Sequence, residues 1–316
     1  MIDRSERLVT IFGGSGFIGR YVTEYLMKAG VRLRIAVRDP RDAYFLQPLG
    51  QVGQMGAIRA NVSDPKAVAR AVEGADAVIN LTGSFGNMEA VHVEGARAIA
   101  QAAKAAGAGA LVHVSAIGAD SGSDSDYART KGRGEDAVRD IFPGSTIIRP
   151  SLVFGPEDAL TNRFAEMARW PVLPILAAGT RFQPVYVRDL ARAIASAALD
   201  PAKHGGEIYE VGGPQVMTME GLHRAILAVT GQEPDLLALP DFAGSALAWF
   251  GWLPGAPLTR DQWRMLRRDN VVAARENGLA AFGIEPTPLA AVAGEWLGRF
   301  RGGRFAASRS DFTTAA

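Results

Sequence analysis

A glycine-spaced turn near the start of the chain constrains the fold more than any other feature. Residues 8–12 form a short apolar run, Gly13, Gly16 and Gly19 follow, and a helical pattern covers residues 17–29. This spacing permits a tight turn, a close backbone approach to a pyrophosphate and close packing of helix on strand. The start of the helix presents free N–H groups and the positive end of its dipole to phosphates. The turn therefore predicts a dinucleotide-binding loop.

Apolar runs alternate with helical patterns over the first half of the chain. Nearly continuous apolar runs in such alternation are typical of a parallel sheet that is buried on both faces. We therefore expect an α/β fold, a Rossmann doubly wound parallel sheet with a smaller, irregular C-terminal region. The predicted strands cover residues 8–12, 32–37, 57–60, 77–81, 110–114 and 145–148, and the predicted helices cover 17–29, 65–73 and 89–106.

The alternation becomes irregular after residue 156 and returns briefly near residue 184, as a short strand followed by an apolar helix. We expect a dinucleotide-binding Rossmann domain made of residues 1–155 with 185–213. Residues 156–184 with 214–300 would form the smaller C-terminal region. The glycine- and arginine-rich end, 301–316, is expected to be a flexible tail.

Composition excludes several classes of function. The chain has 316 residues, a formal net charge of +1 and no cysteine, and its four histidines have no ligand-like spacing. These counts argue against a nucleic-acid partner, a disulfide and a metal site. The first seven residues show no targeting pattern, and no apolar run is long enough to span a bilayer. We expect a protein of the bacterial cytoplasm.

The end of the second predicted strand carries Arg38, where proteins that bind NAD usually place an acidic residue. A guanidinium there pairs with a 2′-phosphate and leaves a bare 2′-hydroxyl without a partner. Arg20, after the third glycine, is a second candidate for this phosphate. Asp39 is a competing feature, because a shift of one residue would restore an acid. The pattern favours NADPH, with NADH less favoured.

Tyr127 and Lys131 lie four residues apart, which places them on one face of a helix. An ammonium beside a phenol stabilises the phenolate and lowers the tyrosine pKa, so the pair can transfer a proton. Ser115, after the fifth predicted strand, would polarise a carbonyl, and Lys131 would also hold the nicotinamide ribose. If the chain is an enzyme, these three residues are its catalytic set.

These motifs together resemble the extended or atypical short-chain dehydrogenase/reductase superfamily. The resemblance rests on the glycine loop, residues 80–83 (NLTG), 113–120 (HVSAIGAD), the Tyr127/Lys131 pair and 148–156 (IRPSLVFGP). It implies that the dinucleotide lies across the carboxyl ends of the strands. The expected cofactor-binding residues are Gly13, Ser15, Gly16, Phe17, Ile18, Gly19, Arg20, Arg38, Asn61, Val62, Leu81, Thr82, Gly83, Ser115, Tyr127, Lys131, Pro150, Leu152 and Val153.

A narrower resemblance covers nearly the whole chain. Residues 91–107, 127–135, 149–158, 180–194 and 209–214 are similar to the dehydrogenase-like accessory subunit of respiratory complex I, and so, more specifically, are 163–176 (RFAEMARWPVLPIL) and 258–272 (LTRDQWRMLRRDNVV). This resemblance implies an accessory or assembly subunit near the quinone-entry region. Its NADPH would be structural rather than redox-active.

The sequence leaves a catalytic alternative open, namely an NADPH-dependent reductase or a sugar-nucleotide epimerase that uses Tyr127 as acid and base. Only eleven residues separate Ser115 from Tyr127. Extended members of the superfamily usually carry a longer insertion there, which helps to build the substrate side. The same residues can also hold a cofactor without reacting, because fold does not imply function.

The stretch from residue 242 to 258 is rich in large apolar side chains. Leu247, Trp249, Phe250 and Trp252 suit a membrane interface or a partner surface. Arg260, Arg264, Arg267 and Arg268 follow and could meet anionic headgroups. The alternative is that the aromatic residues form the core of the second region or the lid of its pocket. On the first interpretation the protein is peripheral to the cytoplasmic face of the inner membrane.

Overall fold

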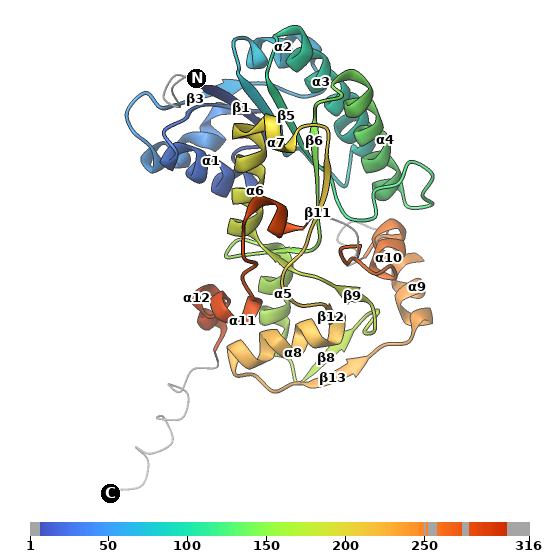
Figure 1. Cartoon of the computed structure of the whole chain (residues 1–316). Coiled ribbons are helices and arrows are strands. Elements are labelled where there is room, and N and C mark those ends of the chain that lie inside the picture. Colours follow the sequence, from blue (N-terminus) through green and yellow to red (C-terminus); the bar gives the residue numbers. More distant parts are fainter. Residues whose placement is uncertain (1–6, 250, 252–257, 274–277, 302–316) are drawn as a thin grey trace, which may run out of the picture.

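The computed structural model describes residues 7–249, 251, 258–273 and 278–301 (Figure 1). Its centre is a seven-stranded sheet in the order β11-β6-β5-β4-β1-β2-β3, and each neighbouring pair in it is parallel. This confirms the predicted doubly wound fold. The strands are β1 (Leu8–Phe12), β2 (Arg32–Val37), β3 (Met55–Arg59), β4 (Ala77–Asn80), β5 (Ala110–Val114), β6 (Thr146–Pro150) and β11 (Ile208–Val211).

Helices cover both faces of the sheet, and each face has its own apolar core. On one face, α1 (Phe17–Lys28) and α6 (Val187–Leu199) pack their buried residues against β1 and β5. On the other face lie α2 (Pro65–Val72), α3 (Ala96–Ala105) and α4 (Asp126–Ile141). Because both faces are covered, most of the strands are nearly continuous apolar runs, as the sequence pattern indicated.

Three features of this layer differ from the sequence-based prediction. The helix predicted over 89–106 begins as a π-helix, η2 (Glu89–Gly95), and continues as α3. The edge strand β11 was not predicted as a strand. A 3-10 helix, η1 (Pro40–Leu49), follows β2, because Asp39 caps it and Pro40 occupies its first position.

Most of the remaining elements form a smaller region, drawn below the sheet in Figure 1, whereas α7 (Pro201–His204) lies beside β5 and β6. The helix α8 (Met219–Thr230) packs on α5 (Ala159–Met167), and β8 (Val172–Ile175) pairs with β13 (Asp235–Ala238). Further short elements are β7 (Val153–Phe154), β9 (Arg181–Phe182), β10 (Val185–Tyr186), β12 (Met217–Thr218), α9 (Asp241–Trp249), α10 (Arg260–Leu266), η3 (Leu279–Phe282), α11 (Leu289–Val292), α12 (Gly294–Leu297) and η4 (Gly298–Phe300). Of the predicted tail, all but residue 301 lies outside the described residues.

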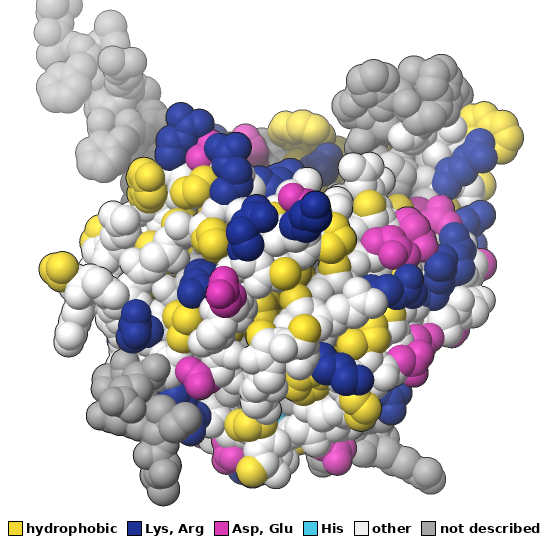
Figure 2. All heavy atoms as spheres, turned by 90° about the horizontal axis from the view of Figure 1, so that it is seen from above, with side chains coloured by type: hydrophobic (Ala, Val, Ile, Leu, Met, Phe, Trp, Pro, Cys, Tyr) yellow, Lys and Arg dark blue, Asp and Glu magenta, His cyan; other side chains and the backbone are white. Residues whose placement is uncertain are grey.

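Figure 2 shows the face that is seen from above the sheet. Basic, acidic and apolar side chains are interspersed over it. Within the described residues, no helix is both long enough and apolar enough to cross a membrane.

The glycine loop packs α1 against the end of β1 with no spare room. Gly13 has a φ of +78°, a conformation that favours glycine. At Gly19, an added Cβ would lie 2.2 Å from the carbonyl oxygen of Gly13 and 2.6 Å from the Cα of Gly14. Both neighbours are backbone atoms, so the contact could be relieved only by moving the loop or the helix. The packing role predicted for the third glycine is therefore visible in the geometry.

We expect Gly19→Ala to lower the free energy of unfolding by about 3 kcal/mol and to weaken dinucleotide binding, since overpacking at a backbone contact displaces the loop. The matched control is Gly56→Ala, where an added Cβ meets nothing within 4 Å. Urea denaturation with a titration of NADPH measures both effects. Equal stability of the two variants would contradict the packing role.

Candidate functional site

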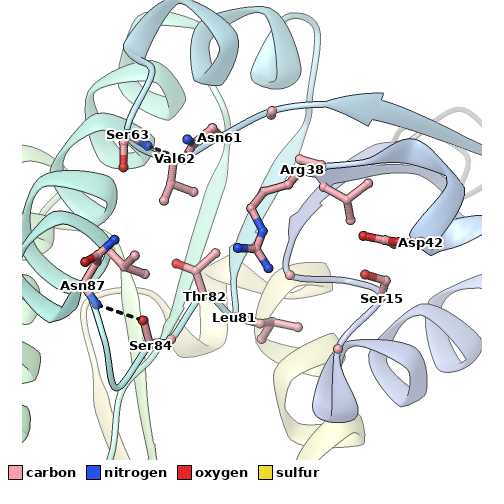
Figure 3. A pocket seen from close by; sticks show the side chains of 17 residues that line it. Ser15, Arg38, Asp42, Asn61, Val62, Ser63, Leu81, Thr82, Ser84 and Asn87 are labelled. Atoms are coloured by element: carbon pink, nitrogen blue, oxygen red, sulfur yellow. Dashed lines mark hydrogen bonds between the residues drawn. The ribbon is translucent and has the colours of Figure 1, made fainter. Parts of the chain in front are cut away.

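A cavity of about 490 Å³ opens at the carboxyl ends of β1, β2 and β4 (Figure 3). The glycine loop forms one wall, and the segments that follow β3 and β4 form the opposite wall. Nine of the expected cofactor-binding residues line it, namely Gly13, Ser15, Gly16, Arg38, Asn61, Val62, Leu81, Thr82 and Gly83. These residues come from four loops that the parallel sheet brings to one edge.

The start of α1 is open towards this cavity. Gly16 is its N-cap residue and makes no side-chain capping bond, and the first turn contains no acidic residue. The first amides of α1 therefore have no capping side chain, and the dipole favours a negative group there. This end of the cavity fits a pyrophosphate.

Arg38, rather than Asp39, faces the cavity (Figure 3). The Asp39 carboxylate is turned towards Arg41, accepting from its backbone N–H at 3.1 Å and from its guanidinium at 2.6 Å. The Arg41 guanidinium and backbone N–H hold the pKa of Asp39 down at about 2. Asp39 is thus occupied as the cap of η1 and does not line the cavity.

Asp42, which the sequence reasoning missed, also lines the cavity, on the side of Ser15 (Figure 3). The cap at Asp39 followed by Pro40 was the available signal. A helix that starts there carries position 42 in its first turn, facing back over the glycine loop. One cation and one anion therefore border the place where the adenosine ribose would lie.

Arg20 does not line this cavity. Its guanidinium pairs with Glu157 at 3.1 Å and lies over the Phe45 ring at 5.1 Å from the centroid. Phe17, Ile18 and Gly19 are likewise absent from the lining, since Phe17 packs on Tyr21 and Gly19 is buried under the loop. These four residues shape the loop and α1 without reaching into the cavity.

A second cavity of about 310 Å³ lies beyond the ends of β5 and β6, against α10. Of the expected residues, Tyr127, Lys131, Pro150 and Leu152 line it. Ser115 and Val153 do not, although Ser115 lies at the end of β5, where its backbone N–H donates to Ile148. Its other lining residues include Phe182, Met265, Arg268, Asp269 and Asn270, which the sequence reasoning did not assign to a site.

The Ser115 hydroxyl lines neither cavity, but it has hydrogen-bonding capacity left for a cofactor. Its oxygen is buried and has no hydrogen-bond partner within the described residues. A buried hydroxyl without a partner is costly, and a ligand that supplies one relieves the cost. Together with the open start of α1, this hydroxyl makes the two cavities compatible with the two halves of a dinucleotide.

The pKa of Tyr127 contradicts the expectation from the sequence. Burial raises the pKa of Tyr127 to about 12. Lys131 does not act as the expected stabiliser of a phenolate, because its Nζ donates to the carbonyl of Val114 at 3.2 Å. Burial lowers the pKa of Lys131 to about 8. Desolvation therefore disfavours the charged form of each group, and it is the only cause of the shift at Tyr127.

The loop after β4 covers Tyr127. Phe85 stacks on the Tyr127 ring with centroids 5.0 Å apart, and His92 meets the ring edge at 5.4 Å. His92 fixes this loop, since its Nε2 accepts from the N–H of Ser84 at 3.0 Å. Its Nδ1 therefore carries the proton and donates to Thr130 at 2.9 Å. Burial lowers the pKa of His92 to about 3, which keeps the ring neutral in this role.

No group of three or more His, Asp or Glu side chains that could hold a metal occurs among the described residues. The residues that line the two cavities indicate a nucleotide-binding protein. The fold and the glycine loop are those of NAD(P)H-binding proteins. The family described as NAD(P)H-binding matches residues 13–164.

Among solved structures, an NADPH-dependent quinone oxidoreductase of Escherichia coli, complexed with NADPH, has the same fold. Its TM-score is 0.70 at 22% identity, over 91% of this chain and 99% of that one. Among curated proteins, the mouse (Mus musculus) mitochondrial NADH dehydrogenase [ubiquinone] 1 alpha subcomplex subunit 9 is 35% identical, over 98% of this chain and 84% of its own length. The ceramide reductase of Caulobacter vibrioides is 34% identical, over 76% of each chain.

The chain belongs to the family of alpha subcomplex subunit 9 of NADH dehydrogenase [ubiquinone], that is, of complex I. The match extends over both the sheet and the smaller region. The predicted resemblance to this family is thereby confirmed.

The low pKa of Lys131 makes stability depend on pH. Folded Lys131 releases its proton near pH 8, whereas the unfolded side chain holds it up to the ordinary lysine pKa of 10.5. Between these values the unfolded state binds more protons, so stability rises with pH. From pH 8 to about pH 10 we expect the free energy of unfolding of the nucleotide-free protein to rise by about 2 kcal/mol more than that of Lys131→Met.

Denaturant titrations at several pH values measure this difference. The matched control is Lys66→Met, which removes an exposed lysine from α2 and should leave the slope unchanged. Parallel slopes for wild type and Lys131→Met would show that Lys131 is not desolvated.

Proposed function

We propose that the protein is an NADPH-binding accessory or assembly subunit of respiratory complex I, in which the nucleotide is structural rather than redox-active. The observation that carries the proposal is the similarity to complex I subunits over 98% of the chain. It includes the smaller region as well as the sheet. The protein would act by docking on other complex I subunits near the quinone-entry region, at the cytoplasmic face of a bacterial inner membrane.

NADPH is the proposed nucleotide because of Arg38. Its side chain points into the first cavity, and it has no ion-pair partner in the part of the chain that the structure describes. A 2′-phosphate would supply that partner through charge-assisted hydrogen bonds. Asp42, on the side of Ser15, would then accept from a ribose hydroxyl. The proposed set is thus selective for the phosphate at one position and for a hydroxyl at the other.

A structural role for the nucleotide is favoured by the state of Tyr127. A proton donor works best when its pKa lies near the ambient pH, and that of Tyr127 is about 12. Phe85 covers one face of the phenol. In the bound state, Tyr127, Lys131 and Ser115 would hold the nicotinamide ribose and carboxamide.

A reductase is the second candidate, and the similarity to ceramide reductase favours it. Ser115, Tyr127 and Lys131 are all present, and the second cavity has apolar side chains such as Leu152, Phe182 and Met265 in its wall. On this hypothesis a long-chain ketone would oxidise NADPH, and Tyr127→Phe would abolish the oxidation. Tight NADPH that no such ketone oxidises would exclude the reductase.

The contact with the membrane or with complex I would lie on α9. Leu247 is 39% exposed and Trp249 is 63% exposed. Phe242, on the same helix, is 75% exposed. Phe250 and Trp252, which belong to the same predicted surface, lie outside the described residues. The arginines behave differently from one another. Arg260 stacks on Trp249 at 4.2 Å and can accompany it to an anionic surface, whereas Arg264 and Arg268 are bound to Asp124.

We expect the protein, purified without added nucleotide, to release close to one NADPH per chain on denaturation. Arg38→Gln should weaken NADPH binding by about 30-fold and leave NADH binding unchanged, because only the phosphate contact is lost. Mass spectrometry of the released nucleotide and calorimetric titration give the two readouts. The matched control is Arg41→Gln, three residues further on and outside the cavity. Equal weakening of both nucleotides would contradict phosphate selection.

Replacing Leu247 and Trp249 together by serine should reduce co-purification with complex I by at least about tenfold and leave bound NADPH unchanged, since apolar anchors dominate such contacts. Trp170→Ser is the matched control, because Trp170 is 57% exposed on another part of the smaller region. Binding to vesicles of anionic lipid, measured in parallel, separates membrane from protein contact. Full retention in complex I would remove α9 from the interface.

A further inference from the structure

One carboxylate joins the smaller region to the helix that carries Tyr127 and Lys131. Asp261, in α10, accepts the backbone N–H of Asp126 at 2.7 Å and that of Tyr127 at 3.0 Å. These are the first two amides of α4, and they lie 135 and 134 residues away from Asp261 in the chain. Figure 1 shows α10 beside α4.

The first turn of α4 has only part of its cap from its own loop. The Ser125 hydroxyl accepts from Ala128 at 3.3 Å, which leaves the preceding amides without a local partner. Asp124 and Asp126 are acidic and close in sequence, yet neither caps these amides. Asp124 pairs with Arg268 at 2.6 Å, and Asp126 pairs with Arg129. The remote carboxylate of Asp261 therefore completes the cap, and its charge also suits the positive end of the helix dipole.

The same short helix also holds the loop before α4. Arg264 donates to the carbonyl of Asp124 at 2.9 Å, and Arg268 donates to the Ser123 hydroxyl at 3.2 Å. Residues 261, 264 and 268 are spaced so that one side of α10 and the residues just after it meet this segment. The beginning of α4 is thus fixed by the smaller region rather than by the sheet.

The position of the first turn sets the position of the whole of α4, because the helix packs tightly against the backbone of neighbouring segments. An added Cβ at Gly132 would lie 2.3 Å from the amide nitrogen of Ser121, and one at Gly134 would lie 2.1 Å from the carbonyl oxygen of His92. The helix cannot tilt without disturbing these contacts. Tyr127 is itself one of the residues whose amide Asp261 holds, and Lys131 follows one turn later.

We propose that Asp261 is a positioning residue for the nicotinamide half of the dinucleotide. By capping α4 from the smaller region, it sets the places of Tyr127 and Lys131 in the second cavity. The inference rests on the proposed function only in taking these two side chains as contacts of the nicotinamide ribose. The first cavity, which would hold the adenosine half, has no residue of α10 in its wall.

The test compares the whole dinucleotide with a fragment that reaches only the first cavity. We expect Asp261→Asn, in the full-length protein stripped of nucleotide, to weaken NADPH binding by about tenfold and to change 2′,5′-ADP binding by less than about twofold. The asparagine keeps one acceptor oxygen and loses the charge. The matched control is Asp241→Asn. Asp241 lies on α9, pairs with Arg267 at 3.4 Å and makes no hydrogen bond or ion pair with α4 among the described residues. Both ligands should bind this control as they bind wild type.

Equal loss of both ligands, or no loss of either, would overturn the positioning role, because a general loss of stability affects the fragment as well. Hydrogen exchange provides a readout that needs no ligand. The amides of Asp126 and Tyr127 should exchange about tenfold faster in Asp261→Asn than in wild type, and unchanged exchange would overturn the cap.

If wild type binds neither NADPH nor 2′,5′-ADP, the proposed cofactor fails while the exchange result still decides the cap. If wild type binds both ligands and Asp261→Asn does not weaken NADPH binding more than 2′,5′-ADP binding, the proposed function stands and this inference fails. Asp261→Ala, which removes both acceptor oxygens, is the stronger variant. If that variant does not fold, Asp261→Asn alone carries the test.

Discussion

The contact of α1 with the loop at the end of β1 is the constraint on which the first half of the site depends. At Gly19 the helix lies so close to the backbone of Gly13 and Gly14 that no side chain fits between them. That approach points the amides at the start of α1 towards the same edge of the sheet as the ends of β2 and β4. Backbone packing thus sets the position of the first cavity. The polar side chains at its edge determine which groups can bind there.

The two cavities of the candidate site differ in how well their residues could be predicted from the sequence. Strands β1, β2 and β5, the glycine loop and Arg38 could all be predicted, because glycine spacing and apolar runs are local patterns. The first cavity is built almost wholly from such local features, and nine expected residues line it. The neutralising role of Arg41 towards Asp39 was not visible, since it depends on the turn into η1.

The second half depends on contacts between distant parts of the chain, and there the sequence was a poorer guide. Phe182, Met265 and Asn270 reach the second cavity only because the smaller region folds back onto the sheet. The spacing of Tyr127 and Lys131 correctly indicated a shared helix face, yet the inferred fall in the tyrosine pKa was wrong. Spacing reports proximity, whereas the pKa also depends on burial, and in this site the cost of desolvation is the larger contribution.

A nucleotide that spans both cavities would add a link between the sheet and the smaller region, which already share an apolar core. The first cavity belongs to the sheet, while α4 takes its position partly from α10. Through Trp263, which is buried and donates to Ser245 at 3.1 Å, α10 packs on α9, whose Leu247 and Trp249 are exposed.

An unbroken series of packed elements thus leads from the nucleotide to the surface proposed for docking. A ligand that binds only the folded arrangement stabilises every element in such a series. If the dinucleotide is tightly held and unreactive, as proposed, it would keep α9 in the orientation that a partner recognises. Rapid exchange of the nucleotide, as turnover requires, would work against that purpose.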